Sequence, residues 1–191
     1  MGLFQRILGP HWPSSPRDEL LSRLPRGKAG AEIGVWRGDF SAKILAVAKP
    51  SVLHLVDPWD FSPQYPKRWY GGLIAKSQHD MDATFDGVVN RFKGDLRVRI
   101  HRDRSADFFA RFTEPLDWVY IDGDHSLEAV LYDLRSAWRC VNPEGILCGD
   151  DLDWVDADGT RPIPAALATF TKETAANYST VGNQFFIQKQ H

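Results

Sequence analysis

Five short aliphatic runs, each followed by a helix-like or loop-rich segment, constrain the fold of this chain more than any other feature. The runs are AGAEIGV, SVLHLVD, LRVRI, LDWVYID and GILCGDD, and each has the length of a β-strand. Strands that alternate with amphipathic helices are typical of βαβ units, in which the strands lie parallel. The sequence therefore predicts an α/β fold built on a mostly parallel sheet.

The end of the chain breaks this alternation. In YSTVGNQFFIQ, Gly182 and Asn183 lie between two strand-like pieces, so we expect the sheet to end in an antiparallel hairpin. The helical segment after His125 has Leu134 and Trp138 on its apolar face and Asp133 away from that face.

The length of 191 residues suits a single domain, which we place at residues 29–191. Residues 1–28 carry prolines followed by DELLSRL, and this pattern predicts an N-terminal arm and a short helix. Residues 60–93 are longer than a usual crossover and open with prolines and aromatic residues. They are predicted to form a lid-like insertion.

Composition excludes several classes of partner. The formal net charge of −2 provides no basic surface for nucleic acid. No stretch approaches the roughly 18 apolar residues of a membrane span. Cys140 and Cys148 belong to no CxxC or Cys/His cluster, so they are expected to be free thiols of a reducing compartment. We expect a cytoplasmic protein with a small-molecule partner, and with neither nucleic acid nor a membrane as partner.

The ends of the first two predicted strands favour a particular cofactor. Gly34 and Gly38 allow a tight turn, but a GxGxxG dinucleotide fingerprint would need glycines where Trp36 and Asp39 stand, which disfavours NAD. An acid, a Gly-x-x-x-Gly turn and a helix start suit a nucleoside that carries an amino-acid tail, such as S-adenosylmethionine. Asp57, at the end of the second strand, can accept hydrogen bonds from both ribose hydroxyls. That last feature is shared with NAD-binding folds.

Four motifs together resemble class I S-adenosylmethionine-dependent methyltransferases, and within them the small O-methyltransferases similar to macrocin-type sugar methyltransferases. They are AEIGVWRGDFS, HLVDPW, VYIDGDHSLEAVLYDL and VNPEGILCGDD, and the resemblance covers roughly residues 29–155. It implies a Rossmann-like class I methyltransferase fold with S-adenosylmethionine as the cofactor. The cofactor-binding residues that it implies are Glu32, Gly34, Gly38, Ser41, Asp57, Arg104, Ser105 and Asp122. One departure is Glu144, which stands in a turn where the family commonly has glycine.

Acidic residues follow the fourth and fifth predicted strands. Asp122 and Asp124 come after the fourth strand, and Asp150 and Asp151 end the fifth. Carboxylates that face one crevice repel one another unless they are protonated or bridged by a cation, and Mg²⁺ prefers such oxygen ligands. The clustering therefore predicts a cation at this edge of the sheet.

The resemblance assigns roles to these residues. It implies that Asp122, Asp150 and Asp151 hold Mg²⁺, with Asp124 competing for the first place, and that His125 is the general base. A cation-bound hydroxyl has a lowered pKa, and an imidazole titrating near 6.5 can take its proton. The alternative for His125 is an ordinary capping or packing role.

The resulting prediction is a Mg²⁺-dependent O-methyltransferase that acts on a hydroxyl of a small molecule, a sugar or another vicinal diol. Tyr65, Trp69 and Tyr70 of the insertion would form the acceptor pocket or a lid. Because related enzymes are often oligomeric, a homo-oligomer is also expected. Three alternatives stay open at this stage: a metal-independent methyltransferase, a Rossmann-like NAD-binding oxidoreductase, and a non-catalytic module that binds S-adenosylmethionine.

Overall fold

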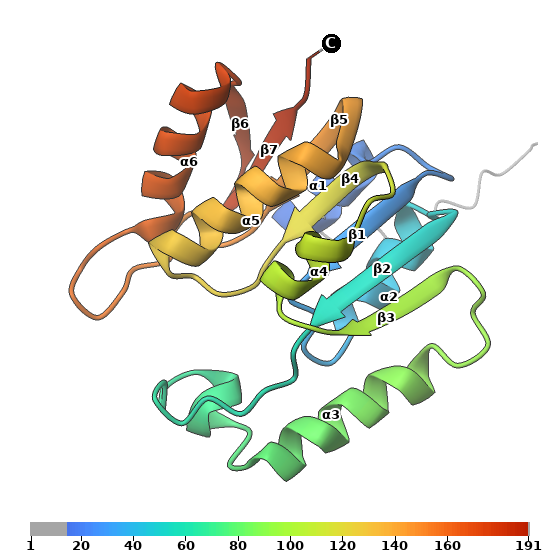
Figure 1. Ribbon diagram of the computed structural model, residues 1–191, viewed down its shortest axis with the longest axis vertical. Coiled ribbons are helices and arrows are strands. Elements are labelled where there is room, and N and C mark those ends of the chain that lie inside the picture. The colour runs from blue at the N-terminus through green and yellow to red at the C-terminus, as the bar shows by residue number, and fades with distance from the viewer. Residues whose placement is uncertain (1–14, 191) are drawn as a thin grey trace, which may run out of the picture.

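One seven-stranded sheet organises the molecule. The computed structural model describes residues 15–190, and the sheet has the strand order β3-β2-β1-β4-β5-β7-β6 (Figure 1). The parallel strands are β1 (Ala29–Ile33), β2 (Val52–Asp57), β3 (Val98–Arg102), β4 (Leu116–Ile121) and β5 (Val141–Gly149). The hairpin of β6 (Tyr178–Val181) and β7 (Gln184–Gln188) adds antiparallel to β5. The predicted parallel sheet with a terminal hairpin is confirmed.

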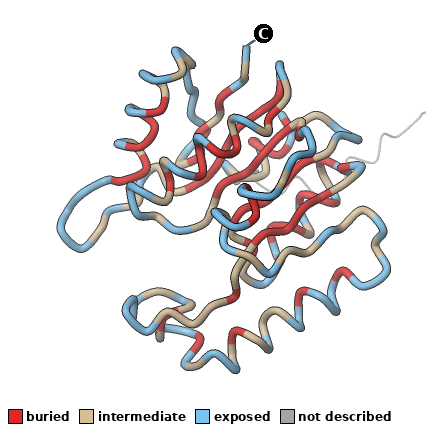
Figure 2. The backbone as a smooth tube through the Cα atoms, in the orientation of Figure 1, coloured by how far each residue is buried: buried red, intermediate tan, exposed pale blue. Residues whose placement is uncertain are grey.

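Helices cover both faces of this sheet. One layer holds α1 (Pro16–Arg23), α2 (Asp39–Val47) and α3 (Gln78–Arg91), and the other holds α4 (Ser105–Arg111), α5 (Leu127–Cys140) and α6 (Pro162–Thr174). Strand β4 serves both cores, since Trp118 and Tyr120 pack under the first layer and Val119 and Ile121 under the second. The central strands are consequently buried on both sides (Figure 2) and appear in the sequence as continuous apolar runs.

The short helix α1 is firmly attached to the body of the protein. The Ser15 side chain accepts a hydrogen bond from the Asp18 backbone N–H, and the Asp18 side chain accepts one from the Ser15 backbone N–H, which completes a capping box. Leu20 and Leu21 are fully buried in the first core. The predicted helix before residue 28 is therefore present, while residues 1–14 of the predicted arm lie outside the described part of the chain.

The predicted insertion has two parts. Residues 78–91 form α3, the crossover helix between β2 and β3, whereas residues 60–77 consist of turns around a π-helix, Trp69–Leu73. This second part folds back on itself, because the Ser62 N–H donates to the Tyr70 carbonyl at 2.9 Å. A Cβ on Gly71 would lie 2.0 Å from the Tyr65 carbonyl oxygen, so only glycine fits there.

The strand order reverses between β1 and β4. From β1 the chain proceeds to β2 on one side, and from β4 it proceeds to β5 on the other, which leaves a crevice at the carboxyl ends of these strands. The Asp122 N–H donates to the Ile33 carbonyl at 2.7 Å, so the loop after β4 lies directly against the end of β1. Among residues 15–190, no helix is both long and apolar enough to cross a membrane.

Candidate active site

Asp57 ties together the loops that follow β1 and β2. Its Oδ2 accepts hydrogen bonds from the backbone N–H groups of Val35 (2.9 Å) and Trp36 (3.0 Å), and its Oδ1 accepts from that of Trp59 (2.7 Å). Burial raises the pKa of Asp57, and these backbone donors act in the opposite direction. A carboxylate offers about four acceptor positions. Roughly one is left for a ribose hydroxyl, so the binding of both hydroxyls stays a prediction.

The other residues predicted at the first loop surround its base. Ser41 Oγ donates to the buried Glu32 carboxyl at 2.5 Å. Burial raises the pKa of Glu32 to about 8, although the Ser41 hydrogen bond opposes this, so Glu32 is mostly neutral at pH 7. Gly34 has a φ of +89°, and a Cβ there would lie 2.0 Å from the Asp122 carbonyl oxygen. Gly38, with a φ of +73°, is the N-cap of α2.

A second group of polar residues lies beside Arg104 and Ser105, the residues predicted to flank the adenine. Arg104 Nη2 donates to Asp60 at 3.3 Å, and Ser105 begins α4. Asp133 of α5 is buried rather than exposed as its place in the helical pattern predicted. Its Oδ1 has no hydrogen-bond partner within residues 15–190, and burial raises its pKa to about 7 although Ser105 opposes the shift. Sequence reasoning missed both Asp60 and Asp133.

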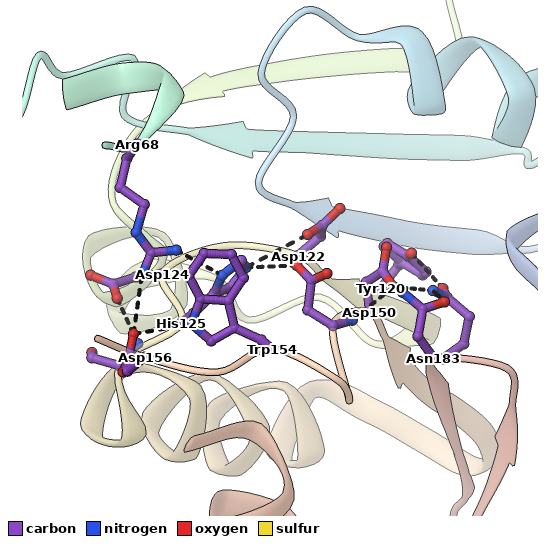
Figure 3. A network of polar contacts seen from close by, with 12 residues as sticks. Arg68, Tyr120, Asp122, Asp124, His125, Asp150, Trp154, Asp156 and Asn183 are labelled. Atoms are coloured by element: carbon purple, nitrogen blue, oxygen red, sulfur yellow. Dashed lines mark hydrogen bonds and ion pairs between the residues drawn. The ribbon is translucent and has the colours of Figure 1, made fainter. Parts of the chain in front are cut away.

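Asp122 and His125 lie side by side at the end of β4 (Figure 3), and Asp151 joins them from the end of β5. His125 Nε2 lies 3.0 Å from Asp151 Oδ2 and 3.9 Å from Asp122 Oδ1. Asp124 is exposed, and its Oδ1 accepts a hydrogen bond from the Ser126 N–H at 2.8 Å. Of the two acids after β4, the structure thus brings Asp122 into the cluster and leaves Asp124 in the turn.

Asp150 faces the hairpin and α1 instead of His125. Its Oδ1 accepts hydrogen bonds from the Asn183 side chain and the Asp151 N–H, both at 2.7 Å, and from the Gln184 side chain. Its Oδ2 accepts from Arg17 Nε at 2.5 Å. Both oxygens of this nearly inaccessible carboxylate (4% exposed) therefore already have several donors.

Arg17 is a site residue that sequence reasoning missed. Its guanidinium bridges the two acidic strand ends, since Nη2 donates to Asp122 Oδ2 at 2.8 Å while Nε donates to Asp150. It also lies 5.0 Å from the centroid of the Phe40 ring. The one signal in the sequence is a cation in the first turn of a helix, where the macrodipole disfavours positive charge.

Arg68 brings the insertion to the same site. Its Nη1 lies 3.1 Å from His125 Nδ1, its Nη2 lies 3.4 Å from Asp156 Oδ1, and its guanidinium carbon lies 3.9 Å from the Trp154 ring centroid (Figure 3). Trp154 in turn donates to Asp156 at 3.0 Å and lies 4.7 Å from the His125 ring. Arg68 thereby links residues 60–77 to the loop after β5.

Two opposing influences act on the protonation of His125. Arginine can only donate hydrogen bonds, so Nδ1 accepts from Arg68 and Nε2 carries the proton that faces Asp151. Burial by itself lowers the pKa of His125, but the nearby carboxylates of Asp122 and Asp151 raise it to about 9. A pKa of about 9 favours a second proton on the ring at pH 7, whereas the Arg68 contact requires a free lone pair on Nδ1, so the protonated ring and this contact exclude each other.

Of the predicted aromatic residues of the insertion, Trp69 lies at the loop after β1. Its half-exposed ring is 5.9 Å from that of Trp36, while the rings of Tyr65 and Tyr70 lie 6.5 Å from each other within the insertion. The insertion thus reaches the loop after β1 through Trp69 and the loop after β5 through Arg68.

The donor set can be compared with the predicted Mg²⁺ site. Asp122, His125 and Asp151 offer ligand atoms within 4.8 Å of one another, but His125 Nε2 carries its proton. Asp150 directs both oxygens at protein donors, and Arg17 already bridges it to Asp122. The set of Asp122, Asp150 and Asp151 does not fit a Mg²⁺ ion in this arrangement.

Comparisons with known proteins agree with this fold. Residues 31–152, more than half of the chain, match the family described as methyltransferase domain. The O-methyltransferase NovP is similar over 92% of this chain and 76% of its own, with 17% identity and a TM-score of 0.62. The O-methyltransferase TomG from Streptomyces achromogenes, in complex with S-adenosylmethionine, is similar over 93% of this chain and 81% of its own, with 15% identity and a TM-score of 0.60. The N-methyltransferase NodS from Bradyrhizobium japonicum is similar over 92% of this chain and 95% of its own, with 14% identity and a TM-score of 0.59. At such identities the likeness shows a shared fold, and no curated protein matches the sequence.

Proposed function

Since this chain belongs to the methyltransferase domain family and is a class I S-adenosylmethionine-dependent methyltransferase with the Rossmann-like fold predicted from its sequence, we propose that it methylates a hydroxyl group of a small molecule. Proteins of this fold methylate both oxygen and nitrogen, as the names of its structural neighbours state, so the acceptor has to be inferred from the site. The observation that carries the proposal is the imidazole of His125, held between Asp122 and Asp151 at the ends of β4 and β5.

S-adenosylmethionine supplies an activated methyl group when bound. We assign its methionine end to Glu32, Gly34, Gly38 and Ser41 around the first loop, beside Asp122. Asp57 would accept a ribose hydroxyl with its remaining acceptor position, and Arg104 and Ser105 would flank the adenine. The unpartnered Oδ1 of Asp133 beside Ser105 supports this, because a buried acceptor without a donor suits a ligand amino group or a water molecule.

His125 is the proposed general base. It would take the acceptor's hydroxyl proton as the hydroxyl oxygen attacks the methyl carbon in line with the bond that breaks. Because its pKa is about 9, the ring has to be in its neutral form before the lone pair on Nδ1 can receive this proton, and in that form Arg68 covers Nδ1 at 3.1 Å. The acceptor hydroxyl would therefore replace the Arg68 hydrogen bond, while Asp151 keeps the ring oriented through Nε2.

The surroundings of His125 favour a sugar or another vicinal diol as the acceptor. Asp156 and Asp151 can accept hydrogen bonds from hydroxyl groups, and Arg68 can donate to them. Departure of Arg68 from Trp154 would also free an aromatic face against which a sugar ring can pack. The same movement would open both the base and this face, which supports the insertion as a lid over the acceptor. Because the predicted Mg²⁺ ligands do not fit, no step of the reaction is assigned to a metal.

We also propose that the protein works in the cytoplasm. Cys140 and Cys148 are free thiols in the structure, which suits a reducing compartment. Formation of a homo-oligomer stays a prediction.

Two measurements test the proposal in order. Calorimetry first compares S-adenosylmethionine binding to the wild type and to Asp57→Ala, which removes the acceptor for three backbone N–H groups of the cofactor loops. Methyl transfer to a panel of sugars, catechols and amines is then measured by mass spectrometry for the wild type, His125→Gln and the surface control His79→Gln.

We expect cofactor binding in the micromolar range, which is lost in Asp57→Ala. His125→Gln should bind the cofactor like the wild type yet lose at least about 100-fold in methyl transfer, as befits a missing general base. Full turnover by His125→Gln would remove the base assignment. Methylation of amines alone, in a panel that includes them, would remove the hydroxyl acceptor.

A further inference from the structure

The guanidinium of Arg17 lies where the two acidic strand ends meet. Parallel pairing of Ile121 with Gly149 places Asp122 and Asp150 side by side, and like charges at such a distance need a compensating cation. We propose that Arg17 takes the place of a divalent cation between Asp122 and Asp150, so that the site is assembled without a metal. The inference concerns the methyl-transfer site proposed above and rests on that function.

The first support is the geometry around Asp150. Arg17 engages Oδ2, while Asn183, Gln184 and the Asp151 backbone engage Oδ1. A metal ion bound by Asp150 would have to break several of these hydrogen bonds at once. The arginine is therefore a structural partner of this carboxylate and leaves it no face for a second cation.

The second support is the rigid mounting of Arg17. Its helix begins with the capping box of Ser15 and is buried through Leu20 and Leu21. A Cβ on Gly182 would lie 2.5 Å from the Pro16 side chain, so the turn of the hairpin packs closely on the start of α1. The backbone that carries Arg17 is thus fixed before the side chain binds, which lowers the entropic cost of the bridge.

The third support is the position of Arg17 within its helix. A cation in the first turn is disfavoured by the helix dipole, and Asp18 and Glu19 in the same turn follow the usual preference for acids. Arg17 gains its stabilisation from Asp122, Asp150 and the Phe40 ring instead. By holding Asp122 Oδ2 it leaves Oδ1 directed at His125, so we assign Arg17 the role of a positioning residue.

The inference is tested with metal binding and unfolding, neither of which needs the acceptor. Mn²⁺ binding is measured by electron paramagnetic resonance, and the melting temperature is measured in EDTA and in about 5 mM Mg²⁺, a concentration above the dissociation constant of about 1 mM that is typical of a weak site. The proteins are the wild type, Arg17→Met, Arg17→Lys, Arg17→Met with Asp150→Asn, and Arg23→Met. Arg23 is the matched control, because it lies on the same helix and, within residues 15–190, forms an ion pair only with Glu19.

We expect the wild type and Arg23→Met to bind Mn²⁺ no more tightly than about 1 mM and to melt at the same temperature in EDTA and in Mg²⁺. Arg17→Met should melt about 5 °C lower in EDTA, recover in Mg²⁺, and bind Mn²⁺ at least about tenfold more tightly. The added Asp150→Asn change should abolish that gain. If Arg17→Met does not fold, Arg17→Lys should still show a smaller loss in EDTA with recovery in Mg²⁺, since lysine keeps the charge but cannot bridge two carboxylates as a fork.

Two results would overturn the inference. One is micromolar Mn²⁺ binding by the wild type that Arg17→Met leaves unchanged, because the metal and Arg17 would then coexist. The other is an Arg17→Met protein that melts like the wild type in EDTA and gains no Mn²⁺ site. S-adenosylmethionine binding, measured on the same samples, reports separately on the proposed function.

Discussion

His54 and His101 show how a single pair of residues can set the acid sensitivity of the fold. They face each other from β2 and β3, with His54 Nδ1 at 3.0 Å from His101 Nε2. Burial lowers the pKa of His54 to about 4, and His101 and Arg99 act in the same direction. One ring donates and the other accepts, so both are neutral in the folded state.

We predict that this pair destabilises the protein in mild acid. An unfolded histidine titrates near 6.5, so above this pH neither state binds the proton and the stability is complete. As the pH falls from 6.5 toward 4, His54 binds a proton in the unfolded state but stays neutral in the folded state. The free energy of unfolding therefore decreases, by about 2 kcal/mol at pH 5. Urea unfolding at pH 7.5 and pH 5.0 should show a smaller loss for His54→Gln than for the wild type. His79→Gln, on an exposed position, is the control, and equal losses in all three proteins would contradict the assignment.

At the scale of elements, Arg68 links residues 60–77 to the part of the site that follows β4 and β5. Arg68 supplies contacts to three residues near the loop after β5, namely His125, Trp154 and Asp156. Its removal should therefore loosen the insertion without disturbing α3, which has its own buried residues Met81 and Val88.

We predict that Arg68→Ala accelerates amide hydrogen exchange in residues 66–74 by about tenfold, because a partly desolvated cation–π contact and its hydrogen bonds contribute about 1 to 2 kcal/mol. Lys67→Ala is the matched control, since Lys67 is exposed and adjacent to Arg68. Hydrogen exchange followed by mass spectrometry makes the measurement. Exchange at the wild-type rate in Arg68→Ala would show that the insertion is held by other contacts.

For the whole molecule, the sequence predicted what depends on local pattern. The β4 run, with apolar residues at Trp118, Val119, Tyr120 and Ile121, indicated a strand of a parallel sheet, and Gly182-Asn183 indicated the hairpin; both are confirmed. The sequence did not predict a role for Arg17, because its acidic partners Asp122 and Asp150 lie more than 100 residues away along the chain. Clustered acids indicated a need for positive charge, but a pattern of acids does not reveal that the cation is a side chain from a distant helix.

Asp150 joins α1, β5 and β7, so its removal should affect the stability of the whole fold. We predict that Asp150→Asn lowers the free energy of unfolding by about 2 kcal/mol, because Arg17 loses the charge that compensates its own and the hydrogen bonds from Asn183 and Gln184 must rearrange. Asp151→Asn should cost less than about 1 kcal/mol, since Asp151 is more exposed and asparagine tolerates its φ of +64°.

Urea unfolding of both variants measures this difference, and S-adenosylmethionine binding confirms that each variant retains its native site. The pair is matched, because the two substitutions are chemically identical and affect neighbouring residues. Asp151→Asn should instead impair methyl transfer, since Asp151 orients His125 through Nε2. Equal loss of stability in the two variants would contradict this prediction. It would mean that the hydrogen bonds and the ion pair of Asp150 do not stabilise the fold more than the contacts of Asp151 do.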